Sequence, residues 1–240
     1  MRKIHTLLNI MIVVSLWSFP SVFAAEYRIV TTELAPWAMK DAKGIFGEIV
    51  TEIEKRLGSE HRPEQLPWTR AQVMTKSSDN VLIYPVTRTP QRENQFTWMI
   101  PVMRSEMVFV TYDRDPIDET KARDLKTIFA HHNAPPYSIL EGKGFTNLYQ
   151  MYYGVGSVLR MLETGRGDAW FTAKDLALFT IKDSEDKNKF SFGPPVVEGV
   201  LYIAASKKIN PTLVKKYQYF FAELKADGTY DKICKKYLGN

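Results

Sequence analysis

The stretch GIFGEIVTEIEKRLG, residues 44–58, decides the fold class when it is taken together with YRIVTTE, residues 27–33, which precedes it. The second stretch is a short β-rich run and predicts a strand. In the first, isoleucine or leucine recurs every four residues, which is the spacing of one helix face. The charged residues between them, including Glu54, are expected to lie largely off that face, and Gly58 suits the end of the helix.

The same alternation of strand and helix patterns continues to the end of the chain. Alternation of this kind predicts an α/β fold with mainly parallel sheets, and we see no internal repeats. The expected strands are 80–86, 107–112, 168–173 and 200–206, and the expected helices are 137–142, 157–165 and a long one from Pro211.

The N-terminus predicts export. Arg2 and Lys3 precede the apolar run 7–17, Pro20 interrupts it, and small residues follow up to Ala24. This order is typical of a signal peptide over residues 1–24, cut after about Ala24, and the run is short for a membrane span. We therefore expect a protein exported to the periplasm.

Composition narrows the class of function. Removal of residues 1–24, which carry two cations and no acids, leaves 216 residues and lowers the net charge from +5 to +3. That charge is mild and its basic residues are spread out, which argues against a nucleic-acid partner. The hydrophobic fraction of 45% fits a globular chain, and we expect a monomer.

The sequence contains little that could hold a metal or a cofactor, and we expect neither. Cys234 is the only cysteine, so no intramolecular disulfide can form, and a buried, inert thiol is the favoured interpretation. His131 and His132 are adjacent in an expected strand, so their side chains should point to opposite faces. Serine nucleophile elbows, phosphate-binding glycine loops and dinucleotide fingerprints are absent from the sequence.

Two short segments predict an anion site. In PWTRAQV, residues 67–73, Thr69 and Gln72 fit a capping box, which would place Trp68 and Arg70 at the start of a helix. A helix start attracts anions, although Trp68 could equally be a core residue.

In RTPQREN, residues 88–94, Pro90 fixes a turn between two arginines. The planar guanidinium of Arg92 matches a carboxylate with two parallel hydrogen bonds. Two solvated surface cations are the simpler alternative. Farther along, Asp168 in GRGDAWFTA could bind a ligand cation, but more often such an aspartate anchors the turn.

Several segments together resemble one family. They are ELAPWAMKDAKGIFGEIV, the PW and VTRTPQRENQF region, LETGRGDAW and LKADGTYDKICKKYLG, which follow the family's order over nearly the whole mature chain. The chain is similar in these to the bacterial extracellular solute-binding proteins of family 3, the periplasmic receptors of polar amino acid ABC importers.

The resemblance implies a two-lobed fold of the type II periplasmic binding proteins, with a mainly parallel sheet in each lobe and a two-strand hinge. The first lobe would comprise 26–110 plus 198–240, and the second 111–197. The hinge strands would lie near 107–112 and 199–205.

The resemblance also implies roles for particular residues in a ligand site between the lobes. Arg92 would bind a ligand carboxylate, Thr87 would assist it, and Trp68 and Leu34 would cover the ligand. Trp37 and Arg88 would lie beside that site.

The second lobe departs from the family's pattern. Where the family's amino acid binders carry the aspartate that holds the α-ammonium group, this chain has Ala173, and Asp175 comes two residues later. The hydroxyl usual at the first helix of this lobe is also missing from HNAPPYSIL. The ligand is therefore either a small organic acid or an amino compound held by Asp175, Tyr137 or Asn133.

Three functions remain open at this point. The first is a binding protein that delivers a small anionic or zwitterionic solute to the membrane permease of an ABC importer. The second is an enzyme of the cyclohexadienyl dehydratase type, for which Glu33, Glu48 or Glu198 could serve but nothing in the spacing selects one. The third is a partner that presents its ligand to a sensor. We expect the first, without enzymatic activity.

Overall fold

A computed structural model describes residues 27–132, 134–152 and 156–238. The expected signal peptide and Asn133 therefore lie outside the described residues. The strands are β1 (Arg28–Thr31), β2 (Glu64–Gln65), β3 (Val81–Thr87), β4 (Thr97–Tyr112), β5 (Ile128–His131), β6 (Leu148–Met151), β7 (Ala169–Ala173), β8 (Phe190–Phe192) and β9 (Val197–Ala205). The helices are α1 (Ile45–Leu57), α2 (Trp68–Ser77), α3 (Glu119–Ala122), α4 (Pro135–Gly142), α5 (Gly156–Glu163), α6 (Lys174–Ile181), α7 (Pro211–Ala226) and α8 (Thr229–Leu238). Three 3-10 turns complete the set: η1 (Lys40–Ala42), η2 (Pro90–Arg92) and η3 (Lys187–Lys189).

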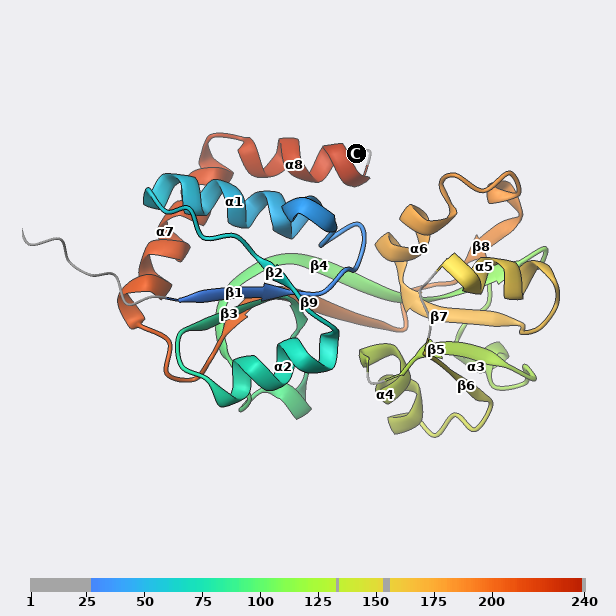
Figure 1. Ribbon diagram of the computed structural model, residues 1–240. Helices are drawn as coiled ribbons and strands as arrows, with labels where there is room; N and C mark the ends of the chain where they lie inside the picture. The colour runs from blue at the N-terminus through green and yellow to red at the C-terminus, as the bar shows by residue number, and fades with distance from the viewer. Residues whose placement is uncertain (1–26, 133, 153–155, 239–240) are drawn as a thin grey trace, which may run out of the picture.

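The elements form two lobes (Figure 1). The first lobe contains β1 to β3, α1, α2, α7 and α8, and the second contains β5 to β8 and α3 to α6. The long strand β4 runs through both, because its first part pairs with β9 and its last part pairs with β7 and β8. In the described residues the strands are ordered β2-β1-β3-β9-β4-β7-β5-β6, with β8 beside β4.

The sheet is mixed, whereas the sequence predicts a mainly parallel one. The pairs within each lobe that surround β1 and β5 are parallel, as strand–helix–strand units require. The pairs that involve β4 or β9 are antiparallel. The difference arises because β4 leads from the first lobe to the second and β9 leads back.

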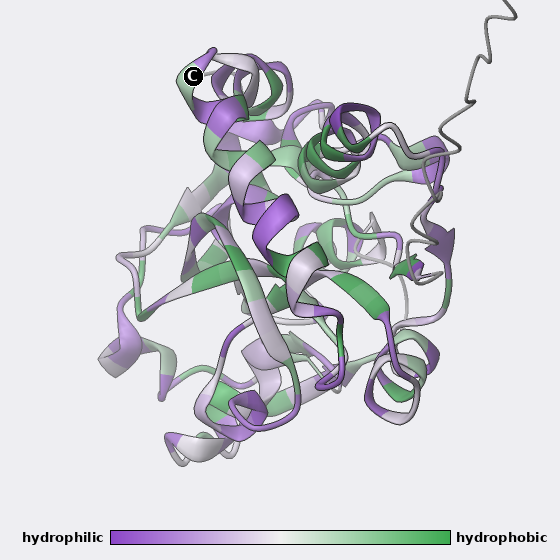
Figure 2. Cartoon of the chain, turned by 90° about the vertical axis from the view of Figure 1, so that its left-hand side faces the viewer, coloured by the Kyte–Doolittle hydropathy of each residue, from purple (hydrophilic) through white to green (hydrophobic). Residues whose placement is uncertain are grey.

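Each lobe buries its own hydrophobic face. In the first lobe, α1, α7 and α8 cover one face of the sheet and α2 covers the other. Figure 2 shows hydrophobic residues concentrated in the central strands and hydrophilic residues on the outer sides of the helices. The isoleucine positions of α1 are fully buried, which confirms the helix face predicted from its four-residue spacing.

Glu54 departs from the expected pattern of α1. Its side chain was expected largely off the apolar face, yet the residue is 3% exposed. Hydroxyl groups of Tyr27, Tyr217 and Ser59 donate hydrogen bonds to its carboxylate. A buried carboxylate is tolerated when donors surround it, and these donors come from segments far away in the sequence.

The capping box predicted for α2 is wrong. The helix starts at Trp68 with Pro67 as its N-cap, so Thr69 lies inside the helix, and no side chain caps it. Val73 is 55% exposed and does not pack back on the helix start. Proline's fixed φ angle already suits this boundary, so the N-cap and the helix start lie two residues before the expected positions. The predicted placement of Trp68 and Arg70 in the first turn is nevertheless confirmed.

Buried tyrosines predict loss of stability at alkaline pH. Burial raises the pKa values of Tyr27, Tyr84 and Tyr217 above 10, whereas tyrosines in the unfolded chain lose their proton near pH 10. The unfolded state therefore binds fewer protons above about pH 10, and the free energy of unfolding should fall as pH rises from there. Urea titrations at pH 8 to 11 will measure this. Tyr84→Phe should flatten the slope by up to about 1.4 kcal/mol per pH unit, and an unchanged slope would contradict the prediction.

Candidate functional site

Arg92 is the centre of the candidate site. It ends η2, the turn that Pro90 starts. Its guanidinium carbon lies 5.5 Å from the ring centroid of Trp68, and Nη1 donates to the carbonyl oxygen of Thr87 at 3.4 Å. Burial lowers the pKa of Arg92 below its ordinary value. Within the described residues it forms no ion pair, so this half-buried cation has no protein counter-charge.

The start of α2 adds further positive potential to the surroundings of Arg92. Trp68, which contacts the guanidinium, is the first residue of α2, and the helix has no side-chain cap. Its first N–H groups and the positive end of the helix dipole are therefore available. Arg70, in the same turn, is exposed. The arrangement can attract an anion and bind it through two parallel hydrogen bonds from Arg92.

Arg88 has a different environment, although it lies only four residues from Arg92. Its Nε and Nη2 donate to the Glu93 carboxylate at 2.8 and 2.5 Å, and the guanidinium lies 5.5 Å from the ring centroids of both Trp98 and Tyr202. Because Glu93 already neutralises the charge of Arg88, this arginine does not need an anion from a ligand. Sequence reasoning predicted a turn at Pro90 but missed this pair, because the pattern does not show that the turn brings Glu93 to Arg88.

The remaining first-lobe candidates lie in the turn after β1 and at the end of β3. Thr87 is the last residue of β3 and is half-buried. Leu34 is half-buried in a tight turn, where its N–H donates to the Ala38 carbonyl at 2.7 Å. Trp37 is only 2% exposed and packs in the core, with no hydrogen-bond partner for its indole N–H among the described residues. The structure thus brings together Arg92, Trp68 and Thr87, and it covers Trp37 with protein.

The second-lobe candidates are placed as follows. Asp175 lies in the first turn of α6, and burial, followed by the neighbouring Glu106, raises the pKa of its carboxyl. Asp168 accepts the backbone N–H groups of Lys126 and Thr127 and pairs with Arg114 at 3.2 Å. It therefore anchors the turn, as the commoner interpretation of this pattern predicts. Asn133 lies outside the described residues.

Ala173 and Cys234 are two further positions that the sequence singled out. Ala173 is 4% exposed and ends β7. Cys234 is half-buried against the core, and burial raises the pKa of its thiol, which fits the inert interpretation. Among the described residues there is no group of three or more histidine, cysteine or acidic side chains that could hold a metal ion.

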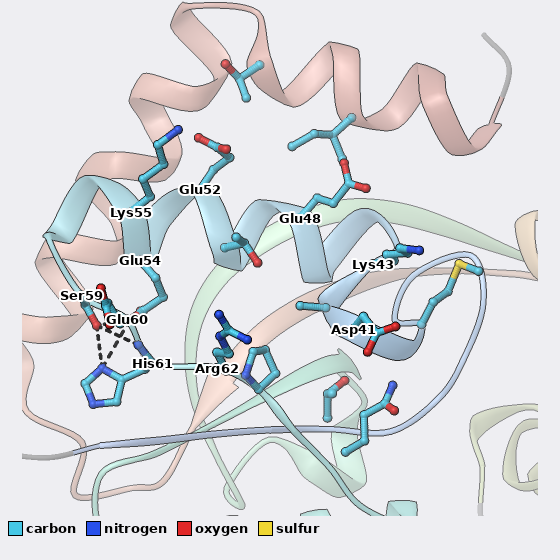
Figure 3. A pocket seen from close by; sticks show the side chains of 18 of the residues that line it. Asp41, Lys43, Glu48, Glu52, Glu54, Lys55, Ser59, Glu60, His61 and Arg62 are labelled. Atoms are coloured by element: carbon cyan, nitrogen blue, oxygen red, sulfur yellow. Dashed lines mark hydrogen bonds and ion pairs between the residues drawn. The ribbon is translucent and has the colours of Figure 1, made fainter.

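A separate pocket of about 1390 Å³ lies in the first lobe beside α1 and α8 (Figure 3). None of its lining residues belongs to the candidate site around Arg92. Its wall carries both acidic and basic side chains, and several already pair with each other, such as Lys236 with Glu48 at 2.6 Å. This balance of charge selects no class of ligand, so the pocket does not displace Arg92 as the candidate site.

Comparisons with known proteins agree with this architecture. A model of the bacterial extracellular solute-binding proteins, family 3, matches residues 28–240. The L-cystine-binding protein TcyA of Bacillus subtilis (strain 168) is 28% identical over 198 residues, which are 80% of this chain and 71% of that protein.

Solved structures share the fold. The histidine-bound substrate-binding protein of an ABC uptake transporter from Streptococcus pneumoniae has a TM-score of 0.79 at 18% identity, covering 89% of this chain and 93% of that one. A putative L-cystine ABC transporter protein from Listeria monocytogenes has a TM-score of 0.76 at 21% identity, covering 89% and 96%. At these identities the likeness concerns the two-lobed type II architecture.

Among the described residues, no helix is both long and apolar enough to cross a membrane.

Proposed function

Because the chain belongs to the bacterial extracellular solute-binding proteins of family 3, we propose that it captures a small carboxylate-bearing solute between its lobes and delivers it to an ABC-type importer. The solute is an amino acid or a related organic acid. The lobes comprise 26–110 plus 198–240 and 111–197, and β4 and β9 form the hinge. The protein acts in the periplasm after removal of residues 1–24, and it has no catalytic role.

The observation that carries this proposal is the environment of Arg92. Even a half-buried cation without a counter-charge is costly, and such groups are found at functional sites. Among the described residues, the Arg92 guanidinium contacts the Trp68 ring and a backbone carbonyl but no carboxylate, whereas Arg88 has Glu93. A carboxylate on the solute would supply the missing charge with two hydrogen bonds in a fixed plane.

Closure of the lobes would make the bound state recognisable to a permease. A solute that contacts both lobes has a higher affinity for the closed state than for the open one, and it shifts the population by that difference. The relatives named above bind cystine and histidine, which are carboxylate-bearing solutes, and this favours the same class here.

The test is a thermal-shift panel on mature protein that has been unfolded and refolded to remove bound ligand. The panel contains amino acids, dicarboxylates and aromatic acids. A solute at 100 times its Kd adds about 2.7 kcal/mol of stability, which corresponds to a rise in Tm of about 5 to 10 °C for a chain of this length. We expect such a rise with at least one carboxylate and its loss in Arg92→Ala, whose Kd should be at least about 100-fold higher.

Arg28→Ala is the matched control. It removes the same charge from the first lobe, but Arg28 is exposed and pairs with Glu64, so its response to the solute should equal that of the wild type. Without ligand, Arg92→Ala should be no less stable than Arg28→Ala, because it removes an uncompensated charge. A full ligand response in Arg92→Ala would refute the proposed carboxylate site.

A further inference from the structure

The second lobe presents an ordered aromatic pair at the edge that faces the first lobe. His132 directly follows β5 and Tyr152 directly follows β6. These strands are parallel, with His131 opposite Met151, so the two side chains come from the same end of the sheet. Figure 1 shows α4 and α6, which follow β5 and β7, starting on the side turned toward α2 and α8. Ligands of open α/β sheets bind outside the carboxyl ends of the strands.

A single amide group holds both rings of this pair. The Gln150 oxygen lies 2.7 Å from His132 Nδ1 and accepts the Tyr152 hydroxyl at 2.9 Å. Because an amide oxygen only accepts, Nδ1 of His132 is the donor. The two ring centroids are 4.5 Å apart and the planes are inclined by 33°. The pair is therefore an oriented surface whose side chains are already ordered before a ligand arrives.

This surface is uncovered. Tyr152 is 66% exposed, more than any other large hydrophobic residue among those described. An exposed aromatic side chain is common. One that is held by both a hydrogen bond and a tilted neighbouring imidazole has lost conformational freedom while its surface stays exposed. A planar group that covers it would recover that contact at little further cost in conformational entropy.

The same edge offers few groups for a charged ligand. Helix α4 starts with Pro135 and Pro136, which have no N–H group, and its N-cap Ala134 has no side-chain acceptor. Asp168 accepts the N–H groups of Lys126 and Thr127, just before β5, so it lies at the opposite end of these parallel strands. Among the described residues, Glu106 lies near this edge, where it pairs with Lys174 at 3.4 Å. Asp175 is half-buried in the first turn of α6, and burial raises the pKa of its carboxyl.

Resting on the proposed function, we infer that the solute is an aromatic carboxylate without an α-ammonium group. Arg92 binds its carboxylate from the first lobe, and the Tyr152–His132 pair stacks on its ring from the second lobe when the lobes close. An amino acid would bring its α-ammonium group to the second lobe without a free counter-charge, and burying such a group is costly. An uncharged aromatic ring avoids that cost.

The test uses isothermal titration of refolded mature protein with matched probes. The aromatic probes are phenylacetate, 3-phenylpropanoate, 4-hydroxybenzoate and indole-3-acetate. Phenylalanine and tryptophan add the ammonium group, and 3-cyclohexylpropanoate keeps the carboxylate but loses the aromatic ring. We expect at least one aromatic probe to bind about tenfold or more tightly than these comparison compounds. Tyr152→Ala should weaken that probe about tenfold, as loss of an aromatic contact does.

Tyr219→Ala is the control, because Tyr219 is a similarly exposed tyrosine (59%) on α7 of the first lobe. Its affinity for the probe should match that of the wild type. Tighter binding of amino acids, or equal affinities of Tyr152→Ala and Tyr219→Ala, would overturn the inference. If those amino acids still depend on Arg92, the proposed carboxylate site survives. If no carboxylate binds in an Arg92-dependent way, the inference and the proposed function fail together.

Discussion

Replacement of Glu54 by alanine is expected to lower the free energy of unfolding by about 4 kcal/mol. The Glu54 carboxylate lies on α1 and is 3% exposed. The Tyr27 hydroxyl lies 2.8 and 2.7 Å from its two oxygens, the Ser59 hydroxyl donates at 2.6 Å, and Tyr217 donates to Oε1. Alanine would remove this acceptor from the buried hydroxyls of Tyr27 and Tyr217 and would open a cavity between them.

The expected loss is large because one side chain connects three elements. Tyr27 immediately precedes β1, Glu54 belongs to α1, and Tyr217 belongs to α7. A loss of about 4 kcal/mol is a substantial part of the 5 to 15 kcal/mol that is typical of folded domains. Urea unfolding followed by far-UV circular dichroism measures it, and Tyr217→Phe, which removes one donor only, should cost about 1 to 2 kcal/mol.

The control is Glu52→Ala on the same helix. Glu52 is half-buried, and no hydrogen bond or ion pair of its side chain is found among the described residues. The change should stay within about 0.5 kcal/mol, and helix propensity slightly favours alanine. Equal losses for Glu52→Ala and Glu54→Ala would show that the hydroxyl cluster does not stabilise the lobe.

Glu54 also shows where prediction from the sequence ends. The four-residue spacing of isoleucines correctly predicted α1, because helix periodicity is a local property of the chain. The burial of Glu54 depends on hydroxyl groups that are 27 and 163 residues away, and periodicity contains no information about them. The failed capping box at Thr69 is of another kind, since Pro67 fixes the boundary through its own backbone geometry.

The candidate site likewise combines features that the sequence predicts with features that it does not. The resemblance places the carboxylate site at Arg92 because the motif TPQR is continuous in sequence. It places Arg88 only beside that site and does not reveal the ion pair with Glu93, which the η2 turn brings to Arg88. The ordered pair of His132 and Tyr152 is equally invisible in the sequence, since β6 was not predicted and its register with β5 brings the two rings together.

Gly193→Ala is expected to destabilise the second lobe by about 3 kcal/mol. A Cβ atom at this position would lie 2.0 Å from the carbonyl oxygen of Ile117. The position of a Cβ atom is fixed by the backbone, and the atom it would contact belongs to the backbone, so no side-chain rotation can relieve the clash. Gly193 also donates its N–H to the Phe109 carbonyl at 2.9 Å, and Ile117 is 5% exposed, so neither segment is free to move away.

Gly142→Ala is the matched control in the same lobe, and it should have the opposite sign. Gly142 is the last residue of α4, and a Cβ atom there would meet no heavy atom within 4 Å. Alanine in a helix should therefore stabilise the protein by about 0.5 to 1 kcal/mol. Differential scanning calorimetry of both variants measures the two effects. If Gly193→Ala is as stable as Gly142→Ala, the backbone around Ile117 moves away at little cost, and the expected clash does not constrain this part of the second lobe.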